Sequence, residues 1–82
     1  MVGRERTFTK LQGQYLAFIH LYTKLTGRPP AEADMQAYFK VTPPAVHSMV
    51  LGLAARRLIA RVPGQPRSIK VLVPRDEIPD LE

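Results

Sequence analysis

The sequence contains no cysteine and only two histidines, His20 and His47. It can therefore form neither a disulfide framework nor a thiolate zinc site, and two histidines alone are too few to hold a metal ion. No stretch is apolar for long enough to span a bilayer, and the first residues, MVGRERTFTK, lack the apolar core of a signal peptide. We therefore expect a cytoplasmic protein with no cofactor, no metal and no membrane partner.

Residues that would indicate catalysis are also absent. A chain of 82 residues allows one domain with one small core and leaves no room for a separate catalytic domain. Glu32 and Asp34 are close in sequence, but no nucleophile or metal-binding cluster accompanies them. In the first turn of a helix they have a sufficient structural role, because the helix dipole favours negative charge there. We expect no enzyme and no small-molecule ligand.

Acidic residues are scarce until the last seven positions. Residues 1–75 contain all 12 lysines and arginines but only three acidic residues, a net charge of +9, and residues 76–82 add four acidic residues. A domain with this balance attracts polyanions, of which DNA is the most abundant class. The excess charge is equally compatible with simple solubility, so charge alone does not decide between the two.

The first predicted helix covers residues 10–25. Thr9 and Gln12 have the spacing of a capping box, Gly27 suits a left-handed C-terminal cap, and Pro29-Pro30 prevents continuation. Its aromatic residues suggest a stacking platform for single-stranded nucleic acid, but their helical period favours a core. The residues expected on the buried face are Leu11, Tyr15, Leu16, Phe18, Ile19, Tyr22 and Leu25.

A second and a third helix follow. The second is expected over 31–39, with Met35, Tyr38 and Phe39 facing inward. In the third, Thr42 is a suitable N-cap and Pro43 suits the first helical position. The buried face of the third helix is predicted to consist of Val46, Met49, Val50 and Leu53, and the helix to close at Arg56 and Arg57.

A hairpin and an acidic tail complete the chain. Residues 58–62 and 68–73 have strand composition, and Pro63-Gly64-Gln65-Pro66 supplies the turn. The fold class is therefore mainly α with a small β-hairpin, a three-helix winged helix-turn-helix. We expect a flexible N-terminus over 1–8, the domain over 9–74, and an acidic extended tail without regular structure over 75–82.

The third helix and the hairpin together predict binding to double-stranded DNA. The outward face of the third helix carries small side chains, so the helix fits a major groove. The N–H groups of its first turn are placed to approach a phosphate. The hairpin would lie along the backbone as a wing, since phosphate contacts position a protein without reading sequence. The candidate DNA-binding residues are Thr42, Pro44, Ala45, His47, Ser48, Arg56, Arg61, Arg67 and Lys70. For His47 and each single cation, a solvated surface residue is an equally good interpretation.

Several motifs resemble the N-terminal DNA-binding domain of the LexA repressor family, a winged helix-turn-helix. They are Thr9-x-x-Gln12, Tyr15-Leu16-x-Phe18-Ile19, Thr26-Gly27-Arg28-Pro29-Pro30, Thr42-Pro43, Leu53-x-x-Arg56-x-Leu58-Ile59, Gly64–Ile69 and Pro74–Pro79. The resemblance implies a sequence-selective transcriptional regulator, a repressor, associated with the nucleoid. In that family a C-terminal domain carries dimerisation and a serine–lysine self-cleavage site. If these 82 residues are the full protein, we expect a regulator without the self-cleaving domain; if they are a fragment, the remaining part would carry those functions.

The chain also departs from that family's pattern. Ala31 stands where a serine or threonine usually caps the second helix, and Arg57 replaces a common glycine at the end of the third. A single module should bind DNA weakly, and exposed Leu51 is a candidate contact for a weak homodimer. The alternative function is a protein-interaction module whose basic face meets an acidic partner, with the acidic tail folding over that face and weakening DNA binding.

Overall fold

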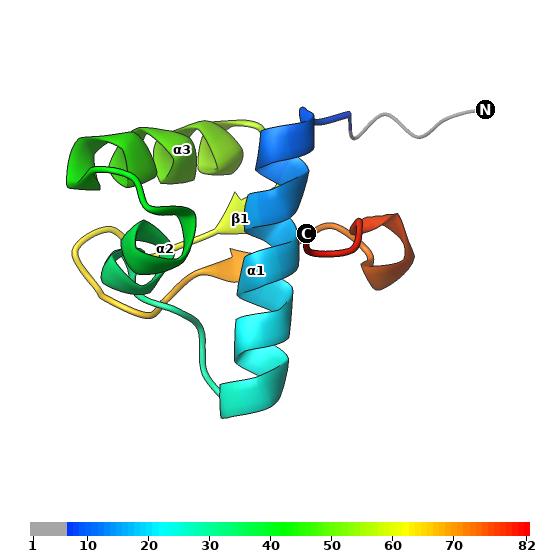
Figure 1. Cartoon of the computed structure of the whole chain (residues 1–82), viewed down its shortest axis with the longest axis horizontal. Helices are drawn as coiled ribbons and strands as arrows, with labels where there is room; N and C mark the ends of the chain where they lie inside the picture. The colour runs from blue at the N-terminus through cyan, green and yellow to red at the C-terminus, as the bar shows by residue number, and fades with distance from the viewer. Residues whose placement is uncertain (1–6) are drawn as a thin grey trace.

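The computed structural model describes residues 7–82 and has three helices followed by a two-stranded hairpin (Figure 1). The elements are α1 (Lys10–Thr26), α2 (Glu32–Phe39), α3 (Pro43–Ala55), β1 (Ile59–Ala60), β2 (Lys70–Val71) and the 3₁₀ turn η1 (Arg75–Glu77). This arrangement confirms the mainly helical winged helix-turn-helix. The flexible N-terminus expected over 1–8 lies mostly outside the described residues. Within them, no helix is both long and apolar enough to cross a membrane.

Helix α1 begins and ends as its sequence predicts. The Thr9 hydroxyl accepts from the Gln12 amide at 3.0 Å, while the Gln12 side chain accepts from the Thr9 N–H at 2.9 Å. Gly27 caps the C-terminus with φ 85°, a left-handed conformation that costs a residue without Cβ little. Leu11 and Leu25, predicted to be buried, are 53% and 80% exposed. They lie in the first and last turns of α1, and its last turn projects past the other helices (Figure 1).

The core lies between the three helices and the hairpin. Tyr15 is 2% exposed, and its ring stacks on Phe39 with centroids 4.0 Å apart. Phe18 packs edge-on against the same Phe39 ring at 5.7 Å, so these aromatic rings of α1 belong to the core and form no stacking platform. The fully buried aliphatic residues include Leu16, Ile19, Met35, Val46, Val50, Leu53, Leu58 and Ile59. Tyr38, expected to face inward, is instead 43% exposed.

The caps of α2 and α3 differ in quality. Ala31 offers no side chain to α2, and only the return bond of a capping box is present, from the Ala31 N–H to the Asp34 carboxylate at 2.8 Å. The Thr42 hydroxyl caps α3 by accepting from the Ala45 N–H at 3.3 Å. The carboxylate of Asp34 therefore replaces part of what the missing serine or threonine would supply.

Helix α3 ends in a Schellman motif built without glycine. The Leu58 N–H donates to the Leu53 carbonyl at 3.0 Å, and the Arg57 N–H donates to the Ala54 carbonyl at 3.0 Å. Arg57 takes the left-handed position with φ 60°. Buried Leu53 and Leu58 provide the apolar contact that accompanies this motif. The arginine thus adopts the backbone that glycine would adopt more easily.

The hairpin is shorter than its composition suggests. Each strand has two residues, paired antiparallel with Ile59 opposite Val71 and Ala60 opposite Lys70. Beyond them the Ser68 hydroxyl bridges the strands, accepting from the Val62 N–H at 3.0 Å and donating to the Val62 carbonyl at 3.2 Å. The predicted strands 58–62 and 68–73 were therefore too long: at Val62 the Ser68 hydroxyl takes the place of a backbone partner.

Residues 75–82 do not form the extended, irregular tail that we expected. They contain the turn η1 and then dock against α1, opposite the wing and the start of α3 (Figure 1). The Gln14 side chain donates to the Asp80 carbonyl at 2.9 Å and accepts from the Glu82 N–H at 2.7 Å. The tail therefore does not cover the candidate DNA-binding face, and the predicted shielding of that face is wrong for this structure.

Candidate nucleic-acid interface

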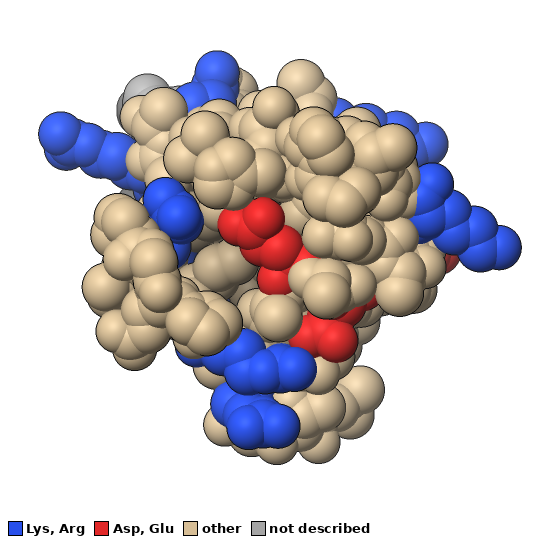
Figure 2. All heavy atoms as spheres, turned by 90° about the vertical axis from the view of Figure 1, so that its left-hand side faces the viewer, with Lys and Arg blue, Asp and Glu red and all other residues tan. Residues whose placement is uncertain are grey.

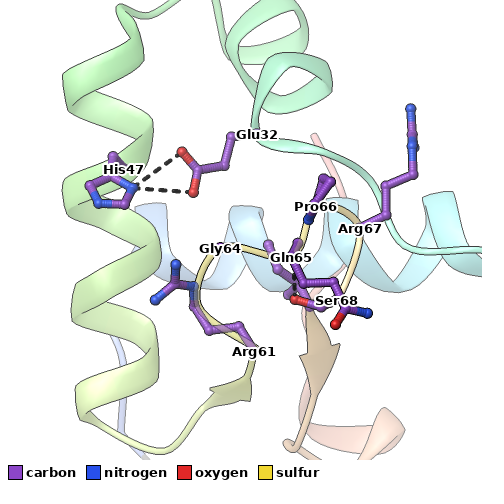
Figure 3. Close-up of a pocket in the computed structure, with 9 residues that line it drawn as sticks. Glu32, His47, Arg61, Gly64, Gln65, Pro66, Arg67 and Ser68 are labelled. Carbon is purple, nitrogen blue, oxygen red and sulfur yellow. Dashed lines mark hydrogen bonds and ion pairs between the residues drawn. The ribbon is translucent and has the colours of Figure 1, made fainter.

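The start of α3, α2 and the wing share one face of the molecule, and this face is hollowed. Glu32, His47, Arg61 and wing residues 64–69 line a hollow of about 380 Å³ (Figure 3). All five predicted contact residues in α3 are exposed: Thr42, Pro44, Ala45, His47 and Ser48. The structure thus places the predicted contact residues at the start of α3 beside the wing, an arrangement that the docking hypothesis requires.

The first turn of α3 offers few N–H groups to a phosphate. Pro43 and Pro44 have no amide hydrogen. The Ala45 N–H donates to the Thr42 hydroxyl, and the Val46 N–H donates to the Thr42 carbonyl at 3.1 Å. The N–H groups of the first turn of α3 are therefore absent or bonded internally, so they are less open to a phosphate than we expected.

Arg67 turns away from the wing and ties three elements together. Its guanidinium donates to the Pro29 carbonyl at 3.1 Å and to the Tyr22 hydroxyl at 3.3 Å, and it lies 3.2 Å from the Asp34 carboxylate. The hydrogen bond with Tyr22 raises the pKa of Arg67, and the Asp34 carboxylate acts in the same direction. This network gives Arg67 a structural role that the sequence did not reveal.

The remaining predicted cations do not form one patch. Arg61 lines the hollow, whereas Lys70 lines a second groove of about 430 Å³ between α1 and β2. Successive strand residues alternate faces, and Lys70 pairs with Ala60, so Arg61 lies on the other face of the hairpin. Arg56 lies about 20 Å along α3 from Thr42, and its guanidinium donates to the Thr7 carbonyl at 2.6 Å.

Acidic groups lie within the face that we expected to be purely basic. Figure 2 shows carboxylates near its centre with lysine and arginine around them. Glu32 contacts His47, and Asp34 contacts Arg67. The described residues contain no cluster of three or more groups able to hold a metal ion. Sequence reasoning missed Glu32 as a member of this site, because its partner is 15 residues away on another helix.

Comparison with known proteins supports the resemblance seen in the sequence. No protein-family model matches the chain. It is 36% identical over 72 residues to the LexA repressor of Thermosipho melanesiensis and 38% identical over 72 residues to that of Thermosipho africanus. The chain is related to the LexA N-terminal domain. Each alignment covers 88% of this chain but only 36% of the LexA relative, so the LexA-like domain spans just over a third of their length.

Proposed function

We propose that this LexA-like domain is a sequence-selective, double-stranded DNA-binding regulator of transcription that acts as a repressor. The main support is one observation: the first half of α3 is exposed, carries mostly small side chains and lies beside the wing. Helix α3 would enter the major groove, with His47 and Ser48 at base edges and with Pro44 and Ala45 against thymine methyl groups. These side chains are all exposed, and small residues let the helix approach the bases closely.

Phosphate contacts would come mainly from side chains, since the N–H groups of the first turn of α3 are absent or bonded internally. Arg61 is the wing cation on the hollowed face, and Lys70 lies on the other face of the hairpin. Within the described part of the chain, neither side chain has an ion pair or hydrogen bond that would compete with a phosphate. We therefore expect a modest, salt-dependent affinity for one copy, and a gain when two copies occupy adjacent half-sites. The weak homodimer through Leu51, which is 46% exposed, is part of the same proposal.

The deciding experiment is fluorescence anisotropy with a pool of random duplexes, titrated at several salt concentrations, followed by sequencing of the bound DNA. Salt-dependent binding with an enriched motif is the expected result, and a symmetric motif would indicate paired copies. Binding without a motif would contradict sequence selectivity. No binding at low salt would contradict the DNA-binding function and favour the alternative below.

The second candidate function is recognition of an acidic protein partner. The groove between α1 and β2 favours it, because apolar Ile19 and Val71 line it together with the basic side chains of Lys24 and Lys70. An acidic segment with apolar anchors would match this surface in charge and polarity. Neutralising Lys24 and Lys70 together should weaken such binding and leave any DNA motif unchanged.

A further inference from the structure

His47 is held from the side by a residue of another helix. Its Nδ1 atom lies 3.2 Å from one carboxylate oxygen of Glu32 and 3.3 Å from the other. The His47 side chain is 51% exposed and that of Glu32 is 32% exposed. Figure 3 shows the opposite edge of the imidazole pointing away from the hollow and from Glu32. The second helix therefore fixes which edge of the ring faces outward.

The contact fixes the chemistry of Nδ1, and in a neutral imidazole it fixes that of Nε2 as well. An ionised carboxylate has no proton to donate, so Nδ1 must carry the hydrogen and Glu32 must accept it. In a neutral imidazole only one nitrogen is protonated, which leaves Nε2 as a bare acceptor. A hydrogen bond to one ring nitrogen thus decides what the other nitrogen can bind.

We propose that Glu32 is a positioning residue that presents Nε2 of neutral His47 to a base edge as a hydrogen-bond acceptor. This inference rests on the proposed function. In the major groove the donors on base edges are the exocyclic amines, N6 of adenine and N4 of cytosine. His47 therefore selects a base with an amine at one position of the motif, and it disfavours guanine and thymine, which present acceptors there.

The position of Glu32 favours a role in sequence selectivity over a role in affinity for DNA. A carboxylate on a DNA-facing surface repels phosphates, so it weakens binding to every sequence. Asp34 is tied to Arg67 and to the Ala31 N–H, which gives that carboxylate a structural role. For the Glu32 carboxylate, by contrast, the contact made within the described residues is the one to His47. The dipole of α2 favours this charge in the first turn, and the contact with His47 gives the carboxylate a second role, that of orienting a residue that would read bases.

The test is selection from a random duplex pool at pH 8. The wild type is compared with Glu32→Gln, Glu32→Leu and His47→Ala at one salt concentration. Glu32→Gln and Glu32→Leu remove the same charge, but only glutamine retains an oxygen that accepts from Nδ1–H. Asp76→Leu removes a charge from the exposed turn η1 and is the control for charge alone.

The wild type should prefer adenine or cytosine at one position by roughly fivefold, the value of one net hydrogen bond. His47→Ala and Glu32→Leu should both lose this preference, while Glu32→Gln retains most of it and Asp76→Leu retains all of it. The readout is the preference at that position, because both neutral Glu32 variants should bind all DNA more tightly.

Three results would overturn the inference while leaving the proposed function standing. In the first, Glu32→Leu keeps the base preference that His47→Ala loses. In the second, His47→Ala itself keeps the base preference. In the third, the preferred base at the His47 position is guanine or thymine. A wild-type protein that enriches no motif would overturn the proposed function, and this inference with it. Thermal unfolding of each variant separates lost reading from lost folding.

Discussion

The Gln14 side-chain amide is one of the groups that hold the C-terminal tail on α1, and its removal should be measurable. The Gln14 side chain is 9% exposed and makes two hydrogen bonds to the tail backbone, at 2.9 and 2.7 Å. Replacing it by leucine keeps the approximate volume and removes both bonds. Asp80 and Glu82 are exposed, so their freed backbone groups return to water, and each lost bond costs about 1 kcal/mol. Gln14→Leu should therefore destabilise the domain by about 2 kcal/mol, which lowers Tm by roughly 8–16 °C in a domain of this size.

Urea and thermal denaturation of four proteins would test this reasoning. They are the wild type, Gln14→Leu, a chain ending at residue 78, and the combination of the two changes. Because Gln14 acts through the tail, the substitution should cost less than about 0.5 kcal/mol in the shortened chain. Gln36→Leu on α2 is the matched control, since the Gln36 side chain is also partly buried but makes no hydrogen bond within the described residues. Equal losses in the full and shortened chains would refute the proposed role of Gln14.

Three further outcomes follow from the same structure. Arg57→Gly should raise the urea midpoint by the equivalent of about 0.5 kcal/mol, since the left-handed cost of a side chain at φ 60° exceeds the added chain entropy of glycine; a lower midpoint would contradict this account of the α3 cap. Arg61→Gln should reduce the salt slope of DNA binding by about one, and an unchanged slope would exclude its phosphate contact. Arg67→Gln should chiefly lower Tm, because the Arg67 guanidinium is tied to Tyr22, Pro29 and Asp34. Burial raises the pKa of Tyr15, so the stability contributed by its neutral form is present below the ordinary tyrosine pKa of about 10 and is lost as pH rises through the folded-state pKa. Tyr15→Phe should remove that alkaline loss, and unchanged pH dependence in a urea series would contradict it.

The elements that sequence reasoning predicted well are fixed by local interactions. The capping box at Thr9 and Gln12 and the left-handed Gly27 need only residues within one turn of a helix end. Thr42 and Pro43 likewise determine where α3 begins. The order of the helices and the core face of α3 follow from the same short-range periodicity.

The features that were missed depend on contacts between distant residues. Arg67 resembles any wing cation in sequence, and only the packed loop before α2 turns its guanidinium toward Pro29. The hairpin composition predicted longer strands, because nothing local shows that the Ser68 hydroxyl replaces part of the ladder. No local sequence pattern indicated the role of Gln14, because its two hydrogen-bond partners lie more than 60 residues away.

The net charge of the domain overstates the charge available for DNA. Arg67 is committed to Asp34 and Lys10 is paired with Glu82, while Arg56 lies at the far end of α3 from the recognition residues. Residues 43–46, the first turn of α3, contribute no free N–H group either. If Arg61 and Lys70 alone met phosphates, log K would fall with log salt at a slope of only about −2, well below that of a repressor dimer. Under the proposed function, such a surface would read sequence through His47 and Ser48 while holding DNA weakly, so useful occupancy would require a second DNA-binding module on the same site.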